Sequence, residues 1–374
     1  MSDAFIPLSR PWFGAREEEL VLEALRSRQI ALGPRLPEFE RALARRLGVD
    51  RVSAVSSGTA GLHLAIRAAG VKRGDEVVTS PFSFVASANC LLYEGARPVF
   101  CDIDPRTLNL DPAAAADALG DRTAGLLPVH IFGYPADLPA IERMADGRFI
   151  VEDACEALGA VHADGTPVGT RGNLAVFGFY PNKQLTTGEG GAVVSGEHKR
   201  RIDSERNQGR APDMGWLDHD RLGFNYRLDD LSCALGLAQL ERLDELLAAR
   251  ARVASLYGEA LAKIEGLELP RPDEGGDRRS WFVYVVQLPR GVDRDRAVRG
   301  LRERGIDSKP YLPAIHLMSF YRERFGHREG EFPVCEDVAS RSLALPFFPE
   351  LGEGQIDRVA AGLREALGAR PVRG

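Results

Sequence analysis

Short apolar runs alternate with helix-like segments through the first half of the chain. Between residues 51 and 195 the runs are rich in Val, Ile, Leu and Phe, and the segments between them carry apolar residues at helical spacing. The spacing predicts strands over residues 51–55, 76–79, 98–101, 125–129, 149–151 and 175–179, and helices such as 61–69 and 86–93. Strand and helix repeated in this order are typical of a mainly parallel sheet with helices on both faces. The sequence therefore predicts an α/β fold that binds its ligand at the carboxyl ends of the strands.

The segments on either side of this region predict a lead-in and a second, smaller unit. Two helices are expected in residues 1–50, the second with apolar residues spaced from Leu36 to Leu47 and a stop at Gly48. A long helical pattern covers residues 228–262, with a break expected within 248–252. After a stretch rich in Pro, Gly and Asp, the pattern predicts a strand over 281–288, a helix near 293–304, an irregular stretch over 309–333 and a last helix near 354–367. We therefore predict a large domain over residues 1–245 and a small α+β domain over 246–374.

Composition excludes several classes of function. The 374 residues include 48 basic and 54 acidic side chains, for a net charge of −6, whereas a general nucleic-acid binder is normally basic. No apolar run approaches the ~20 residues that span a bilayer, and the first residues lack the pattern of a secretory signal. The five cysteines are scattered without a C-x-x-C pair, which favours reduced thiols over a zinc site. We expect a cytoplasmic protein with no nucleic-acid partner, no membrane and no metal.

The candidate chemistry centres on a lysine within residues 174–194. An apolar, aromatic-rich run stops at Pro181, Lys183 follows, and Thr and Gly residues lead to a second apolar run from Ala192. This pattern predicts two buried strands whose connection presents one amine. Lysine is rarely buried without a function, and an amine at the mouth of an apolar pocket can form a Schiff base with an aldehyde. A surface lysine on a hairpin loop is the alternative.

A possible phosphate cradle lies in Val55-Ser56-Ser57-Gly58-Thr59-Ala60-Gly61-Leu62. A predicted strand ends here and a helix begins. Small residues let the backbone approach a ligand, and the free N–H groups of a helix start attract an anion such as phosphate. The alternative is a simple helix cap by Ser57 or Thr59.

Two carboxylates, Glu152 and Asp153, follow the predicted strand at 149–151. Because side chains alternate along a strand, only one of them can point into the ligand crevice. An aspartate there could keep a pyridine nitrogen protonated. The alternative for Asp153 is an N-cap.

An aromatic pair, Phe82 and Phe84, follows the predicted strand at 76–79. One ring at a strand end can stack on a flat cofactor, and the alternative is that both rings belong to the core. Together, a phosphate cradle, an aromatic platform, an aspartate and a lysine are the parts that pyridoxal phosphate requires.

The same segments carry a resemblance to a known family. The chain resembles the nucleotide-sugar aminotransferases of the DegT/DnrJ/StrS type, within the aspartate-aminotransferase fold (fold type I), over nearly its whole length. The most specific matches are Ser57-Gly58-Thr59, Val151-Glu152-Asp153-Ala154, Asn182-Lys183 with Thr186-Thr187-Gly188-Glu189-Gly190-Gly191, and Gly223-Phe224-Asn225-Tyr226-Arg227.

The resemblance implies a role for each matched residue. Lys183 would be the Schiff-base lysine of pyridoxal 5'-phosphate and Asp153 the partner of its ring nitrogen. Gly58 and Thr59 would hold the phosphate, and Phe84 would stack on the ring. Asn225 would reach the cofactor phosphate of the neighbouring subunit, so that a homodimer shares its active sites. Without the family, Asn225 would be a turn residue.

Three departures from the family pattern concern the cofactor and the sugar. Glu156 stands where many members carry His or Gln, and it either changes the protonation of the cofactor or turns away from it. Gly178 stands where many carry a phosphate-binding Ser, so a backbone N–H would have to substitute. Residues 28–33 lack the Trp and Thr often found near the sugar.

For the substrate, the resemblance places His316 nearby, with Tyr311 in the same irregular stretch. Arg227, Lys309 or Arg10 could meet a diphosphate, although a structural His and solvated surface charges are the defaults. The predicted reaction moves an amino group from glutamate or glutamine to a nucleotide-linked keto sugar, preferably a 4-keto-6-deoxy sugar, for polysaccharide or glycoside biosynthesis. Alternatives are a 3-keto sugar, a keto-inositol, a sugar dehydratase, whose relatives replace the lysine with His, or a regulatory protein of the same fold.

Overall fold

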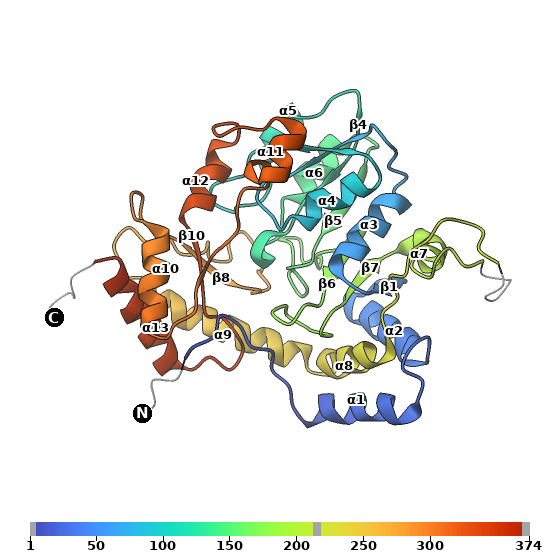
Figure 1. Cartoon of the computed structure of the whole chain (residues 1–374), viewed down its shortest axis with the longest axis horizontal. Coiled ribbons are helices and arrows are strands. Elements are labelled where there is room, and N and C mark those ends of the chain that lie inside the picture. The colour runs from blue at the N-terminus through green and yellow to red at the C-terminus, as the bar shows by residue number, and fades with distance from the viewer. Residues whose placement is uncertain (1–4, 212–217, 369–374) are drawn as a thin grey trace.

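A seven-stranded sheet organises the computed structural model, which describes residues 5–211 and 218–368 (Figure 1). Its strands are β1 (Val52–Val55), β2 (Glu76–Thr79), β3 (Arg97–Phe100), β4 (Thr123–Leu127), β5 (Phe149–Asp153), β6 (Leu174–Gly178) and β7 (Gly191–Val194). They lie in the order β1-β7-β6-β5-β4-β2-β3, and β7 alone runs antiparallel to its neighbours β1 and β6. The mainly parallel α/β sheet predicted from the apolar pattern is confirmed.

Side chains of each strand alternate between two cores, one on each face of the sheet. Val151 of β5 packs in the core that includes helices α3 (Gly58–Ala68) and α4 (Ala86–Tyr93). Ile150 points the other way, toward α5 (Pro112–Asp117) and α6 (Leu138–Ala145). The same opposite face is covered farther along by α2 (Arg35–Leu47) and α8 (Asp230–Glu241), against which α1 (Ala15–Ser27) packs. The predicted stop of α2 is confirmed, since Gly48 adopts a left-handed conformation there.

A three-stranded antiparallel sheet forms the second part of the molecule. It consists of β8 (Tyr284–Gln287), β10 (Ser342–Leu345) and β9 (Lys309–Pro310) in that order. Helices α9 (Leu243–Leu261), α10 (Arg294–Glu303) and α13 (Glu353–Ala366) share its core. The other elements are α7 (Lys199–Glu205), α11 (Ser319–Phe325), α12 (Pro333–Arg341) and the short η1 (Ile131–Gly133), η2 (Gly196–His198) and η3 (Ile315–Leu317). No helix within residues 5–211 or 218–368 is long and apolar enough to cross a bilayer.

The long helical pattern after residue 228 forms two helices, but the predicted place of the break was wrong. The chain leaves helical geometry at Arg242, between α8 and α9, and continues as one helix through residues 248–252. The Arg242 guanidinium stacks on Trp12 at 4.1 Å and bonds to Glu245. The break therefore coincides with a contact to a distant residue and not with a Gly or Pro, so the local sequence does not reveal its position. The predicted domain boundary at 245/246 falls inside α9, and the division into two domains stays a prediction.

The stretch over residues 309–333 is more regular than predicted. It contains β9, η3 and α11, the last of which ends at Gly326 in a left-handed cap. Tyr321 of α11 is buried against Phe100 of the large sheet, with ring centroids 5.9 Å apart. Packing against a remote strand stabilises a helix too short to be predicted from its own sequence. The pattern also did not predict α12 and β10.

Candidate active site

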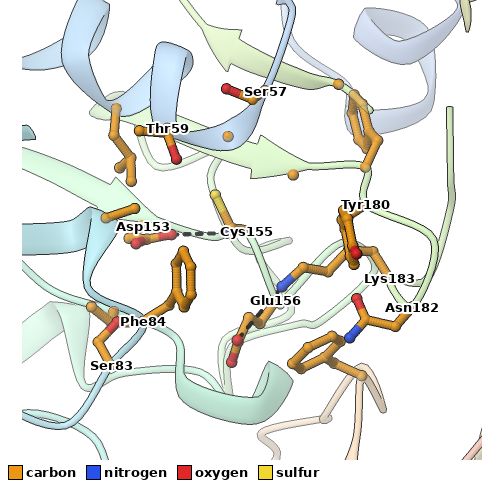
Figure 2. Close-up of a pocket in the computed structure, with 18 of the residues that line it drawn as sticks. Ser57, Thr59, Ser83, Phe84, Asp153, Cys155, Glu156, Tyr180, Asn182 and Lys183 are labelled. Atoms are coloured by element: carbon orange, nitrogen blue, oxygen red, sulfur yellow. Dashed lines mark hydrogen bonds and ion pairs between the residues drawn. The ribbon is translucent and has the colours of Figure 1, made fainter. Parts of the chain in front are cut away.

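A cavity of about 500 Å³ opens at the carboxyl ends of β5 and β6 (Figure 2). Its walls come from the start of α3, the segment before α4, the end of β5, the loop after β6, and two residues of the second part, Phe282 and Tyr311. Eight of the predicted site residues line it: Gly58, Thr59, Phe84, Asp153, Glu156, Gly178, Lys183 and Tyr311. Segments spread over more than two hundred residues therefore meet where the sheet topology predicts a ligand.

The start of α3 supplies backbone donors at the upper edge of this cavity in Figure 2. Ser57 is extended and caps the helix, since its hydroxyl accepts the N–H of Ala60 at 3.1 Å, as the capping alternative predicts. The N–H groups of Gly58 and Thr59 lie in the first turn, where a helix has no carbonyl partners of its own. A Cβ on Gly58 would lie 2.8 Å from Sγ of Cys155, and a Cβ on Gly178 would lie 3.5 Å from it. Cys155 thus fills the space between the helix start and the end of β6.

Asp153 faces the cavity, and Glu152 faces away from it. The Asp153 carboxylate is 5% exposed and accepts the Ser87 hydroxyl at 2.6 Å and the Cys155 N–H at 3.1 Å. Behind the sheet, Glu152 lies 3.1 Å from Nε2 of His130 and accepts the N–H of Gly169. Alternation along β5 therefore separates the two acids, as predicted.

Hydroxyl groups that the sequence reasoning missed extend from Asp153. Ser87 at the start of α4 lies 2.7 Å, oxygen to oxygen, from Ser83, and both are buried. Ser83 lies before α4 and Ser87 in its first turn, so no helical spacing in the sequence marks this pair. The hydroxyl of Ser87 bonds one carboxylate oxygen of Asp153, and Ser83 in turn bonds Ser87.

Lys183 enters the cavity from the loop after β6, opposite Asp153 in Figure 2. Its Nζ lies 3.5 Å from Oε1 of Glu156 and 3.8 Å from the ring centroid of Phe282. The other oxygen of Glu156 accepts the N–H of Phe132 at 2.9 Å. Burial raises the pKa of Glu156, and the nearby charge of Lys183 opposes that shift. The structure shows the Glu156 carboxylate turned toward the lysine amine, and its effect on the protonation of the cofactor stays a prediction.

The aromatic residues divide between the core and the cavity. Phe82 is fully buried against Phe132, as its core alternative predicts, whereas Phe84 is 60% exposed and borders the cavity. Burial raises the pKa of Tyr311, whose ring packs near Phe132 and Phe282. The cavity therefore offers a flat ligand one accessible ring, that of Phe84, and the aromatic side chains of Phe282 and Tyr311 on the side of Lys183.

Five predicted residues do not line the cavity of the described chain: Arg10, which bonds to Glu350, and Asn225, Arg227, Lys309 and His316. Asn225 and Lys309 are exposed, and Arg227 bonds to Asn207 and Gln208. His316 is fully buried, with Nε2 3.0 Å from Glu336, which agrees with the structural alternative for this residue. Burial lowers the pKa of His316, so the ring is neutral more readily than a free histidine.

The residues of the cavity fit pyridoxal phosphate in the chemistry of their donors. The fit rests on a primary amine, a buried carboxylate on the opposite wall, the N–H groups of a helix start and an exposed ring around one space. A cavity of this volume lies within the range of small-molecule sites, about 300–1,000 Å³.

Comparison with known proteins agrees with this chemistry. A sequence model of the DegT/DnrJ/EryC1/StrS aminotransferase family matches residues 12–364. The chain belongs to this family. The aminotransferase is 37% identical over 372 residues to GDP-perosamine synthase of Caulobacter vibrioides, which covers 97% of this chain and 98% of that protein. It is 34% identical over 380 residues to the spore coat polysaccharide biosynthesis protein SpsC of Bacillus subtilis, with 97% of each chain covered.

Solved structures confirm the predicted fold class. The aminotransferase aligns with DesV of S. venezuelae, solved with a ketimine intermediate, at a TM-score of 0.90 and 33% identity over 99% of this chain and 100% of that one. Such neighbours are aminotransferases that depend on pyridoxal phosphate. The family and these neighbours therefore imply pyridoxal phosphate as the cofactor of this chain.

The close contact at Gly58 yields a prediction that a double variant can test. Gly58→Ala alone should lower the melting temperature, because its methyl would lie 2.8 Å from Sγ of Cys155, an overpacking that costs about 1–3 kcal/mol. Cys155→Ala removes the sulfur and leaves a Cβ at 3.9 Å, so the double variant should regain most of the loss. Thermal denaturation measures both effects. Gly120→Ala, which meets nothing within 4 Å, is the matched control. A double variant no more stable than Gly58→Ala would contradict the packing described.

Proposed function

We propose that this aminotransferase transfers an amino group from glutamate or glutamine to a keto sugar carried on a nucleotide, preferably a 4-keto-6-deoxy sugar, in the cytoplasm. The observation that carries the proposal is the meeting of Lys183, Asp153, Phe84 and the start of α3 around one cavity. The intact lysine speaks against a sugar dehydratase of the same fold. The names of the relatives, GDP-perosamine synthase and a polysaccharide biosynthesis protein, support a sugar carried on a nucleotide.

The lining of the cavity supports a sugar more than a small diacid. Within the described chain the lining residues include Phe84, Tyr180, Phe282 and Tyr311 but no arginine. Aromatic faces and hydroxyl groups suit a sugar ring, whereas a second carboxylate is best recognised by an arginine fork. A 3-keto sugar or a keto-inositol would suit the same wall, and both belong in the test.

Each residue of the site has a proposed task. Gly58 and Thr59 would hold the phosphate through backbone N–H groups, Gly178 would leave room beside them, and Asp153 would be the partner of the ring nitrogen. Bound pyridoxal phosphate would supply a carbonyl that takes up the amino group and a ring that withdraws electrons. Lys183 would anchor the cofactor and then, once released, take and return the substrate proton at Nζ. Glu156 gives that amine a bonding partner 3.5 Å away whenever it is free.

A second copy of the chain completes the proposed site. Asn225 is exposed and does not line the cavity of its own chain, whereas Phe84 and Tyr180 at the cavity are 60% and 53% exposed. Leu222, three residues before Asn225, is 71% exposed. Large apolar side chains left in solvent beside a ligand cavity are typical of a contact surface. We therefore propose a homodimer in which Asn225 of each subunit serves the cofactor phosphate of the other, and Arg227, Lys309 and His316 stay candidates for the substrate side.

The function is tested by single-turnover spectroscopy. The protein loaded with pyridoxal phosphate should have a visible absorption band that glutamate removes. Nucleotide-linked keto sugars should restore the band faster than pyruvate or oxaloacetate, because aromatic side chains line the cavity and no arginine of the described residues does. Among the cyclic substrates, we expect 4-keto-6-deoxy sugars to react faster than 3-keto sugars or a keto-inositol. Lys183→Ala is the control that should give no such cycle. Fast recovery only with small keto acids would overturn the sugar assignment, and preference for the keto-inositol would move the enzyme to cyclitol chemistry.

A pair of carboxylate variants tests which acid serves the ring. Asp153→Asn should slow the reaction with glutamate by roughly 10²–10³-fold, because a buried charge that stabilises the transition state is removed. Glu156→Gln should slow the reaction with glutamate much less, since the Glu156 carboxylate faces the Lys183 amine and not the side of the cavity where Asp153 lies. Stopped-flow loss of the visible band measures both rates. Near wild-type rates in Asp153→Asn with a large loss in Glu156→Gln would transfer the role to Glu156.

Subunit mixing tests the shared site. Lys183→Ala and Asn225→Ala should each be inactive alone. After exchange in equal amounts, half of the dimers are mixed and one of their two sites is intact, so roughly a quarter of wild-type activity should return. Mixing Lys183→Ala with itself is the control. A fully active monomer in sedimentation, or exchange without recovery, would count against the proposal.

A further inference from the structure

Arg250 is a buried arginine beside the lysine loop that the proposed mechanism does not use. It lies on α9, is 3% exposed and forms no ion pair with any carboxylate among the described residues. Burial lowers its pKa to about 10, so the guanidinium still carries its charge at neutral pH. A buried charge without a counter-ion is costly and is poor support for stability by itself. Its position therefore needs a reason other than folding strength.

The bonds of Arg250 all go to main-chain carbonyls around Lys183. Nη2 donates to the carbonyl of Lys183 at 2.7 Å and to that of Asn182 at 3.2 Å. Nη1 donates to the carbonyl of Phe282 at 3.2 Å. One guanidinium thus joins two segments that are about a hundred residues apart in the chain.

These two segments are the ones that determine where the lysine amine lies. The peptide of residues 182–183 carries the side chain, and the Phe282 ring lies 3.8 Å from its Nζ. A second bridge supports them, since Nε2 of Gln184 donates to the carbonyls of Glu156 and Ser280. Glu156 in turn lies 3.5 Å from the same amine. Three contacts therefore restrain Lys183: Arg250 bonds its main-chain carbonyl, the Phe282 ring packs against its amine, and Glu156 pairs with that amine.

We propose that Arg250 is a positioning residue for the transfer: its planar fork fixes the Asn182–Lys183 peptide against the Phe282 segment and thereby sets the place of the Lys183 amine. The inference rests on the proposed function, in which that amine anchors the cofactor and moves the proton. Small displacements of a reacting group reduce rates strongly, by roughly 10²-fold for 1 Å. Lysine at position 250 would keep the charge, but a single ammonium cannot hold acceptors spread over two segments as a guanidinium does.

The matched control is Arg252, two residues along the same helix. Its Nη2 also donates only to main-chain carbonyls, those of Pro349 and Leu351, which lie in the second part of the molecule, away from the cavity. Substitution there perturbs the same helix with the same change of side chain. Arg250→Lys, Arg250→Met, Arg252→Lys and Arg252→Met therefore form one series.

The first measurement uses the protein without cofactor. Hydrogen exchange of the peptide containing residues 180–187 should be about tenfold faster in Arg250→Lys than in the wild type or Arg252→Lys, because two of its carbonyls lose a fixed donor. Unchanged exchange in both Arg250 variants would overturn the inference, since the loop would then be held without this arginine. Arg250→Lys keeps the test valid if Arg250→Met does not fold.

The second measurement uses the loaded enzyme and separates this inference from the proposed function. Borohydride reduction and peptide mapping should find the cofactor on Lys183 in the wild type and in Arg250→Lys. The maximal rate of the glutamate reaction should fall between about tenfold and a hundredfold in Arg250→Lys with little change in KM, and Arg252→Lys should match the wild type. Cofactor on another residue would overturn the proposed function and this inference together. Cofactor on Lys183 with an unchanged rate, or an equal loss in both arginine series, would overturn the role of Arg250 alone.

Discussion

The close approach of α3 to the sheet is the constraint on which the candidate site depends. Gly61 lies where a Cβ would be 2.7 Å from a methyl of Val176, and a Cβ on Gly191 would be 2.8 Å from the backbone nitrogen of Gly58. Glycine at these points lets the helix start rest directly on β6 and β7. The N–H groups of Gly58 and Thr59, which have no carbonyl partner within the helix, then lie at the carboxyl edge of the strands, where a phosphate can be bound without a positively charged side chain.

Asp153, Glu156 and Lys183, three charged side chains that line the cavity, each have a bonding partner. Asp153 is held by a hydroxyl and a backbone N–H, and Glu156 is held by a backbone N–H and faces Lys183. A carboxylate restrained in this way keeps its position when the ligand enters, which is what preorganised electrostatic stabilisation requires. Arg250 restrains the main chain in a similar way, because its guanidinium donates only to carbonyls of the segment that carries Lys183 and of Phe282 beside it.

Much of the candidate site could be predicted because its members sit next to strand ends in the sequence. The apolar run before Asp153 and the glycines after Lys183 place both at the edge of a sheet by local patterns alone. Ser87, Phe282 and Arg250 were not predicted. Their contacts reach residues about 66 to 100 positions away, and nothing in their own segments distinguishes them from ordinary helix or strand residues. His316 is fully buried beside Glu336, and its place near the substrate, which only the family resemblance implies, stays a prediction.

The sequence by itself determined the alternation of strand and helix, the opposite facing of Glu152 and Asp153, and the presence of one lysine between two apolar strands. These properties follow from the period of the chain and from short-range sterics, which act between neighbouring residues. The tertiary structure alone decided that Glu156 turns toward Lys183, that the helix after residue 228 breaks at Arg242, and that Arg250 reaches the lysine loop. Each of these depends on desolvation and bonding between segments far apart in the chain, and such partners become known only when the packing brings them together.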